Sequence, residues 1–245
     1  KTYDGDTTAT IAGSDYTITN TVNSDTFNIT QTLGSYDDED VNDVSSVTVS
    51  LSSSDFSASS GSLSNYTLPS SVSGTGVING KALTITANDA SKIYGQTVTL
   101  TGSEFTSSGL ENSETIGSIS LTSSGAAATA NVNTYDITPS SATGGTFDIN
   151  NYSVTYVNGA LTVNQATLTV TADNVSKTYG DANPSFTATY SGFQNSDTSS
   201  VLTGDPSLNT NATAVSDVGS YIITAAAGDL AATNYTFNFV NGTLT

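Results

Sequence analysis

The segment SKIYG, which ends in Tyr94 and Gly95, recurs as SKTYG, which ends in Tyr179 and Gly180. The match extends in both directions, because KALTITANDASKIYG aligns with ATLTVTADNVSKTYG and NNYSVTYVNGALT aligns with TNYTFNFVNGTLT. Between these marks, GLENSET aligns with GFQNSDT. In a chain of stacked copies, each copy is one small structural unit that contacts its neighbours. The recurrence therefore predicts an array of small domains.

A third, variant copy precedes these two. It begins with KTYDG and carries NYTL near its end, but it is longer between these marks and lacks the first strand. The copies meet near Gly80 and Gln165. These boundaries predict three domains, at residues 1–80, 81–164 and 165–245.

Apolar and polar residues alternate in several short stretches, which is the pattern of strands with one buried face. The clearest stretches are residues 83–87, 152–156, 168–172 and 235–239. Two Asn-Gly pairs, Asn158-Gly159 and Asn241-Gly242, each separate two such stretches and predict two-residue hairpins. Helix signals are nearly absent. One helical turn is predicted from Ser196 to Leu202, with Asp197 as its N-cap.

The predicted fold class is all-β, a tandem array of three small β domains joined end to end as an extended rod. No Gly/Ser-rich or Pro-rich linker separates the copies, since residues 160–164 lead through Gln165 directly into residues 166–172. Such a connection restricts bending. A domain of about 80 residues is small for a self-sufficient core. We expect aromatic side chains to supply much of it, namely Tyr94, Tyr135, Tyr152, Tyr156, Tyr179, Tyr221, Tyr235 and Phe237.

Tyr94 and Tyr179 are predicted to be equivalent buried anchors. Each precedes a glycine at an expected exit from a strand into a turn, where a crowded backbone favours glycine. Truncation of either ring is therefore expected to destabilise the fold.

The composition excludes several classes of protein. Four Lys, no Arg and 22 Asp plus Glu give a formal net charge of −18, so the chain has too few cations to bind a nucleic acid backbone. His and Cys are absent, which removes the commonest general base and nucleophile, and we expect no catalysis. No apolar run approaches the length of a membrane span, so we expect no membrane insertion of this segment. Because methionine is also absent, we expect the sequence to be a piece of a longer array.

One acidic stretch offers a candidate metal site. It packs five carboxylates closely, at Asp37, Asp38, Glu39, Asp40 and Asp43. Oxygen ligands at this density suit calcium, although the spacing matches neither an EF-hand loop nor a nonapeptide repeat. We interpret the stretch as a solvated turn between strands, with a calcium site as the alternative. No other cofactor is expected.

Two of the four lysines, Lys92 and Lys177, occupy equivalent positions. We expect the methylene stem of each to cover apolar surface while the ammonium group caps a carbonyl or pairs with a carboxylate. An intramolecular cross-link from lysine to Asn or Asp is the alternative, and it requires a buried lysine beside an acid.

The combination of marks in fixed order resembles a known family. The middle and last copies resemble the MBG domains of large bacterial surface adhesins, through LTITA and LTVTA, K-x-Y-G, GLENSET and GFQNSDT, and the closing NYSVTYVNGALTV and NYTFNFVNGTLT. The first copy is similar to the companion YDG domain, through KTYDGDTTATI, NYTLP and VSGTGVING. The resemblance implies a stalk or adhesive segment of a filamentous-haemagglutinin-like or autotransporter-like exported protein. It implies an extracellular location, at the bacterial surface or secreted, and no catalytic residues.

Three function classes follow. The leading one is mechanical, a rigid spacer in a cell-surface fibre whose partners are the neighbouring repeats of the same polypeptide. The second is direct binding of surface glycans or a sister fibre through exposed Thr rows or unpaired strand edges. The third is an enzyme such as a glycosidase with paired carboxylates, for which no pair of acids stands out.

Overall fold

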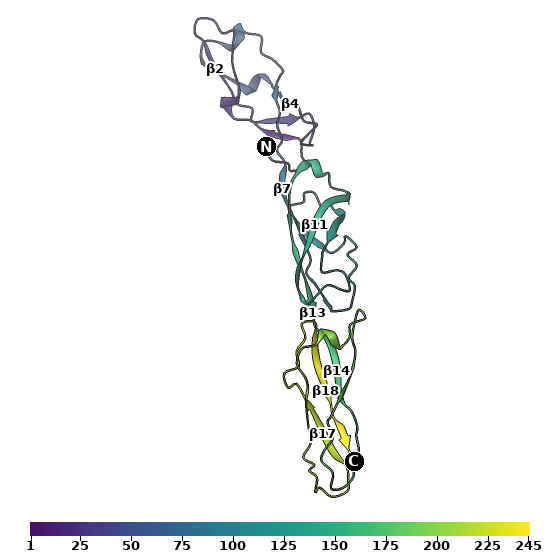
Figure 1. The fold of residues 1–245 in the computed structure, drawn as a ribbon. Coiled ribbons are helices and arrows are strands. Elements are labelled where there is room, and N and C mark those ends of the chain that lie inside the picture. Colours follow the sequence, from purple (N-terminus) through teal and green to yellow (C-terminus); the bar gives the residue numbers. More distant parts are fainter. The chain divides into compact units, whose positions relative to one another are not determined.

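The computed structural model describes all residues from Lys1 to Thr245 and consists of β-strands and short 3₁₀ turns (Figure 1). The predicted all-β fold class is confirmed. Helical residues occur only in five 3₁₀ turns, at Gly13–Asp15, Ser53–Asp55, Leu63–Asn65, Ile149–Asn151 and Ser199–Val201. None of these helical turns has the length and apolar character needed to cross a membrane.

The chain divides into two compact units by its internal contacts. The first unit comprises Lys1–Ile85, Thr106–Ile119 and Ser141–Tyr156, and the second comprises Thr86–Phe105, Ser120–Ser140 and Val157–Thr245. The contacts that join residues 1–80 to the middle repeat thus lie inside the first unit. Those that join the middle repeat to residues 165–245 lie inside the second.

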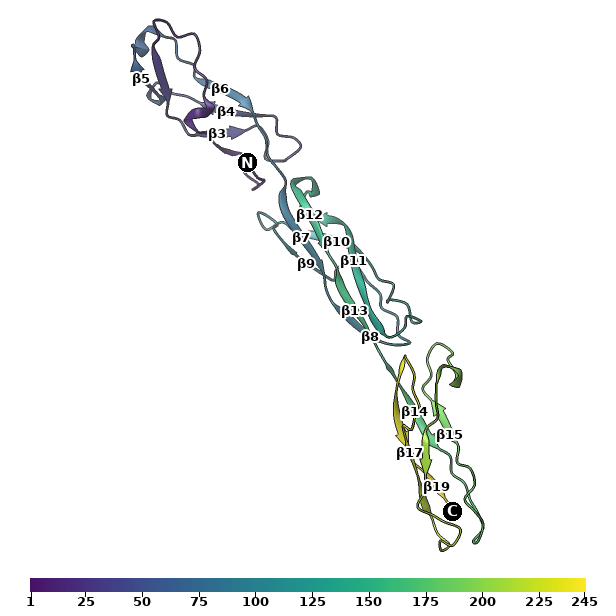
Figure 2. The same ribbon diagram turned by 60° about the vertical axis from the view of Figure 1, so that its left-hand side comes forward.

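The first repeat contains two sheets. Its strands are β1 (Thr8–Thr10), β2 (Thr26–Ile29), β3 (Leu33–Tyr36), β4 (Ser46–Ser50), β5 (Phe56–Ser60) and β6 (Ser71–Thr75). A four-stranded sheet has the order β1-β3-β4-β6, and Figure 2 labels its strands β3, β4 and β6. The second sheet is the pair of β2 with β5. The buried apolar residues of the first repeat include Tyr3, Ala9, Val49 and Ile78. Thr2 forms a parallel bridge with Asn79, so both ends of this repeat lie together.

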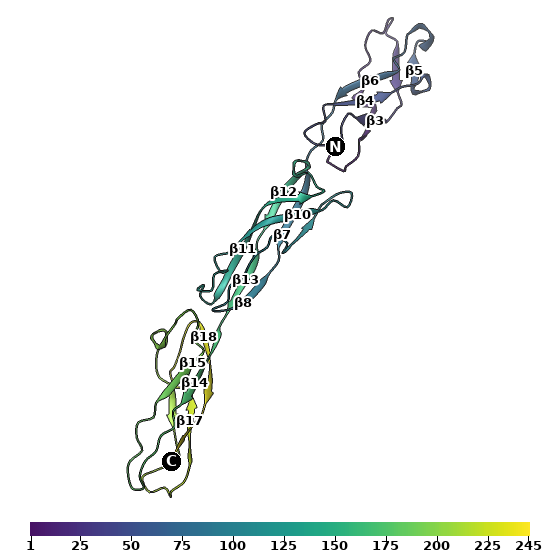
Figure 3. The ribbon, with the colours of Figure 1, turned by 90° about the vertical axis from the view of Figure 1, so that its right-hand side faces the viewer.

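The middle repeat also has two sheets. Its strands are β7 (Lys81–Ala87), β8 (Ala90–Ile93), β9 (Phe105–Ser108), β10 (Ile116–Thr122), β11 (Asn133–Gly145), β12 (Tyr152–Val157) and β13 (Gly159–Asn164). The sheet orders are β10-β11-β13-β8 and β12-β7-β9. Strands β11, β13 and β8 lie side by side in Figure 3, with β13 antiparallel to β11 and parallel to β8. Ala87, Ile137 and Leu161 form a buried cluster.

The last repeat is built around β14. Its strands are β14 (Ala166–Ala172), β15 (Ala188–Ser191), β16 (Ser207–Asn209), β17 (Tyr221–Ala226), β18 (Tyr235–Val240) and β19 (Gly242–Leu244). One sheet has the order β15-β14-β18 and the other β16-β17-β19. Along β14, Leu168, Val170 and Ala172 are buried and alternate with more exposed threonines, as period-2 alternation predicts.

The two Asn-Gly pairs do not form hairpins, so that prediction was wrong. At Asn241-Gly242, β18 pairs with β14 whereas β19 pairs with β17, so the chain passes from one sheet to the other. Gly242 is needed because of close packing, since a Cβ there would lie 2.5 Å from the carbonyl oxygen of Ala172. Gly159 has the same relation to the carbonyl oxygen of Ala87, also at 2.5 Å.

Burial of the aromatic residues follows the prediction with one clear exception. Tyr94, Tyr152 and Tyr235 are buried, and Tyr135, Tyr156, Tyr221 and Phe237 are partly buried. Tyr179 is 62% exposed, so its predicted burial was wrong. The physical reason is that the ring of Tyr94 is covered by residues of the following repeat, whereas no such residues cover Tyr179.

Candidate functional site: the joints between repeats

The second joint is formed by contacts between the middle repeat and the last repeat. Tyr94, directly after β8, packs its ring edge against Tyr235, with ring centroids 5.6 Å apart. Its hydroxyl donates a hydrogen bond of 3.0 Å to Asp197 Oδ2, which also accepts one of 2.7 Å from the hydroxyl of Tyr235. The hydroxyl of Tyr235 in turn accepts from the backbone N–H of Gln194 at 2.9 Å. One carboxylate therefore links a tyrosine from each repeat.

The first joint has the same construction. Tyr3 packs edge-on against Tyr152, with centroids 5.5 Å apart, and its hydroxyl donates to Glu114 Oε1 at 2.9 Å. The hydroxyl of Tyr152 donates to Glu114 Oε2 and accepts from the N–H of Glu111 at 3.0 Å. We call Tyr3 and Tyr94 the joint tyrosines. The acid and tyrosine that each one meets, together with the asparagine before that tyrosine, form the receiving site.

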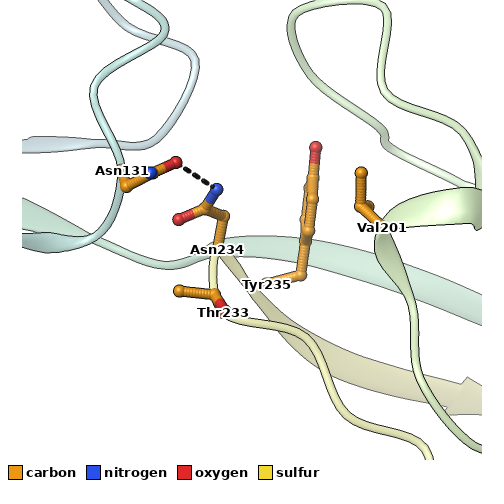
Figure 4. Close-up of a pocket in the computed structure, with 5 residues that line it drawn as sticks. All are labelled: Asn131, Val201, Thr233, Asn234 and Tyr235. Atoms are coloured by element: carbon orange, nitrogen blue, oxygen red, sulfur yellow. Dashed lines mark hydrogen bonds between the residues drawn. The ribbon is translucent and has the colours of Figure 1, made fainter.

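That asparagine adds a second link at each joint. At the second joint, Asn234 Oδ1 accepts from the N–H of Val132 at 2.9 Å, and Asn234 Nδ2 donates to Asn131 Oδ1 at 2.9 Å (Figure 4). Asn151 does the same at the first joint. It accepts from the N–H of Val41 at 2.9 Å and donates to Asp40 Oδ1 at 2.6 Å.

The acid of each receiving site follows a tight turn of the backbone. Asn195 and Ser196, which precede Asp197, have φ of 52° and 64°. The equivalent Asn112 and Ser113, which precede Glu114, have φ of 46° and 60°. Asn tolerates this left-handed region better than most residues, which explains its place in the turn. The turn asparagine also reaches the preceding repeat, because Asn195 Nδ2 donates to the carbonyl of Ala128 at 2.9 Å.

The predicted helical turn around Asp197 needs correction. The structure has a 3₁₀ turn at Ser199–Val201 whose N-cap is Thr198, which accepts from the N–H of Ser200. Asp197 is not the cap, because its carboxylate is directed at the two tyrosine hydroxyls.

Apolar packing continues through the second joint. Tyr94 and Val163 of the middle repeat form one buried cluster with Ala166, Leu168 and Tyr235 of the last repeat. Only Gln165 separates β13 from β14, and its side-chain amide donates to the carbonyl of Thr233 at 3.1 Å. The expectation that strand leads directly into strand is confirmed here.

Burial and the adjacent carboxylates raise the pKa of three tyrosine hydroxyls at the joints, those of Tyr3, Tyr152 and Tyr235. Burial, and then the hydrogen bond to Glu114, raise the pKa of Tyr3 to about 12. Burial and the hydrogen bond to Asp197 likewise raise the pKa of Tyr235 to about 12, and the pKa of Tyr152 is raised for the corresponding reasons. At neutral pH each joint therefore consists of phenol donors facing a carboxylate, which is a strong charge-assisted arrangement.

The polar side chains around a hollow at the second joint bond to each other across the two repeats. A hollow of about 180 Å³ at the second joint is lined by Asn131, Val201, Thr233, Asn234 and Tyr235 (Figure 4). Its asparagines are already bonded to each other, and no buried side-chain nitrogen or oxygen in the chain lacks a hydrogen-bond partner. What this arrangement can do is hold one repeat on the next.

Comparison with protein families agrees with the repeated construction. The model of the MBG domain (YGX type) matches residues 83–162 and again residues 168–245. The chain belongs to the MBG domain family. The model of the YDG domain matches residues 1–74, and no curated protein matches the chain. The two joints described above thus connect a YDG domain to an MBG repeat and one MBG repeat to the next.

The acidic stretch of the YDG domain is largely occupied by its own hydrogen bonds. Asp37 accepts hydrogen bonds from the hydroxyl of Ser45 and from the backbone N–H groups of Ser46 and Ser45, the last two at 2.9 Å, and these bonds hold its pKa well below the usual range. Asp38 accepts from the N–H of Asp40 at 2.9 Å.

Three of its acids lie close together. Carboxylate oxygens of Asp38, Asp40 and Asp43 lie within 4.8 Å of one another, while Glu39 is exposed. Asp40 also bonds Asn151 of the adjacent MBG repeat. The solvated turn stays the prediction for this stretch, and calcium binding stays its alternative.

The two equivalent lysines contact backbone carbonyls. Lys92 is buried, and its Nζ donates to the carbonyl of Gln96 at 2.9 Å and to that of Ala127. Burial lowers its pKa. Lys177 donates in the same way, to the carbonyls of Asp181 at 3.0 Å and Thr213 at 2.7 Å. The expected capping of carbonyls is thus present in both MBG repeats, and a cross-link from either lysine stays an alternative prediction.

Sequence reasoning located the segments of the joints but not the roles of their residues. Glu114 and Asp197 stand at aligned positions in GLENSET and GFQNSDT, and Asn151 and Asn234 precede the aligned tyrosines. Recurrence of an acid directly after the same Asn-Ser pair was the available signal. It did not show that the acid faces the preceding repeat.

Proposed function

We propose that this chain is a non-catalytic structural segment, a stalk or spacer, of an exported bacterial adhesin or surface fibre. In this role the repeats hold a separate binding region away from the cell envelope, and their principal partners are the neighbouring repeats. The observation that carries the proposal is the occurrence of the same tyrosine–carboxylate–tyrosine link and asparagine link at both joints. Hydrogen bonds that join consecutive repeats suit a protein that must resist bending.

The proposal predicts that the second joint is stiff and that Asp197 contributes to its stiffness. The chain has no cysteine, so spin labels can be placed at two exposed positions, Ser124→Cys and Ser220→Cys. The distance distribution between the labels should be narrow. Asp197→Ala should broaden it, because both tyrosine hydroxyls lose their acceptor.

Asp181→Ala serves as the matched control, because Asp181 is an exposed acid of the same repeat. It should leave the distribution unchanged. A broad distribution in the parent chain would contradict the proposed function.

Two further measurements separate this function from the alternatives. A spacer should give no reproducible binding on a glycan array, whereas a carbohydrate-binding segment should. Small-angle scattering tests the predicted rod. Three domains in line should give a radius of gyration on the order of 30 Å, against about 18 Å for one compact globule of this length.

A further inference from the structure

In the last repeat, Tyr179 occupies the position that the joint tyrosine Tyr94 has in the middle repeat, but its side chain is exposed. Tyr179 is 62% exposed, whereas its counterpart Tyr94 is 5% exposed. The local backbone is the same at both positions. Gly95 and Gly180 have φ of 93° and 94°, and their N–H groups donate to the carbonyls of Ala128 and Ala214 at 3.2 and 3.0 Å.

The surroundings of Tyr179 are also built in the same way as those of Tyr94. The hydroxyl of Tyr221 donates to the carbonyl of Asp217 at 2.8 Å, as that of Tyr135 donates to the carbonyl of Asn131 at 2.9 Å. Val218, the residue after Asp217, is 91% exposed.

The surface around Tyr179 and Val218 is exposed, whereas the equivalent surface at the second joint is covered. There, the equivalent of Val218 is Val132, which packs against the joint cluster and donates its N–H to Asn234. A Cβ at Gly95 would lie 2.6 Å from Gln194 Oε1 of the following repeat, but a Cβ at Gly180 would meet nothing within 4 Å. The last repeat thus has an apolar, aromatic face whose equivalent is filled by a neighbouring repeat.

A receiving site without an incoming tyrosine is present in the YDG domain. The hydroxyl of Tyr66 donates to Asp25 Oδ2 at 2.8 Å and accepts from the N–H of Val22 at 3.1 Å, as in the two filled sites. The residues before Asp25, Asn23 and Ser24, have φ of 54° and 59°. Tyr66 is only partly buried, whereas its counterparts at the filled joints are buried. Receiving sites therefore occur in both kinds of repeat, and the one in the YDG domain has its internal hydrogen bonds without an incoming tyrosine.

We propose that the face formed by Tyr179, Asp217 and Val218 is a docking surface for another repeat of the MBG or YDG type. The partner presents an acid after an Asn-Ser turn to the hydroxyl of Tyr179, a tyrosine ring to its edge, and an asparagine to the backbone of Val218. The choice of partner rests on continuity with the two filled joints. The inference also rests on the proposed function, since it assigns the same role to a third joint tyrosine.

The test extends the chain by one repeat. A copy of residues 165–245 is joined after Thr245 through Val-Asn, which reproduces the Val163-Asn164 connection. The chain has no tryptophan, so Tyr179→Trp gives a single reporter in the parent and in the extended chain. Acrylamide quenching should fall several-fold on extension, with a blue shift of emission. In chains with native Tyr179, the amide of Val218 should exchange its hydrogen at least tenfold more slowly after extension.

Two controls locate the cause of any change. Substitutions in the appended copy that correspond to Asp197→Ala and Asn234→Ala should restore both quenching and fast exchange at Val218. Tyr94→Trp in the parent chain reports the filled second joint and should be protected from quenching.

Each outcome bears on a different claim. Protected Tyr94→Trp combined with an unprotected Tyr179→Trp and unchanged Val218 exchange in the extended chain would overturn the docking inference alone. An exposed tryptophan in Tyr94→Trp, with fast exchange at Val132 in the native chain, would overturn the proposed function. Concentration-dependent protection in the parent that Asp25→Ala leaves unchanged, without protection in the dilute extended chain, would show that a second copy covers Tyr179 with a surface other than a receiving site, and would refute the proposal.

Discussion

Truncation of Tyr94 is expected to open the second joint, whereas truncation of the equivalent Tyr179 is expected to have almost no effect. Burial of an aromatic side chain removes about 150–250 Å² of its surface from water. At about 25 cal/mol per Å² this corresponds to an upper value of roughly 4–6 kcal/mol. Collapse of neighbouring side chains recovers part of this, and Asp197 keeps its bond from Tyr235. We therefore expect Tyr94→Ala to lower the free energy of opening the joint by about 3 kcal/mol.

The amide of Val132 provides a local assay for this cost. It donates to Asn234 Oδ1 across the joint, so its native-state hydrogen exchange reports opening of the joint. A loss of about 3 kcal/mol corresponds to an exchange rate on the order of a hundredfold faster. This local readout is preferable to a global melting curve, because unfolding of several domains is not a two-state process.

Tyr179→Ala is the matched control, since both residues stand before glycine at the same place in the repeat. With 62% of its surface exposed, Tyr179 should contribute less than about 1 kcal/mol. Exchange at Val132 should be unchanged in this variant. Equal acceleration by the two substitutions, or none by Tyr94→Ala, would refute the assignment of Tyr94 to the joint.

Three further predictions follow from the contacts. The pKa values of Tyr3 and Tyr235 are raised in the folded chain, so their contribution to stability is fully present below about pH 10 and should be lost as the pH rises through 12. Calorimetry at pH 9 and 11 checks this prediction, and equal stability at the two pH values would contradict it. Gly242→Ala should cost about 1–3 kcal/mol in denaturant unfolding of the last repeat, because its Cβ meets the backbone of Ala172, whereas Gly219→Ala, which meets nothing within 4 Å, should not. Calcium should raise the melting temperature no more than magnesium does if the acidic stretch is a solvated turn, and a calcium-specific rise that disappears when Asp38 and Asp40 become Asn would show a metal site.

Sequence reasoning predicted what depends on local pattern and failed where the answer depends on the neighbouring repeat. Alternation predicted β14 and β18 because a half-buried strand has a fixed period. The recurrence of Tyr-Gly predicted that Tyr94 and Tyr179 are both buried, but equivalence in sequence fixes the backbone and not what covers the side chain. Asn241-Gly242 misled for a related reason. The glycine serves close packing against another strand, which no local pattern reveals.

The chemistry of the joints suits the composition of the chain. With a net charge of −18 and four lysines, the repeats repel one another and have few cations to offset the repulsion. The joints instead bind carboxylates with neutral donors, namely tyrosine hydroxyls and asparagine amides. Such hydrogen bonds are short-range and partly buried, so dissolved salt screens them weakly while it screens the repulsion between the exposed acids. Raising the salt concentration should therefore leave the joints closed, whereas joints made of exposed ion pairs would loosen.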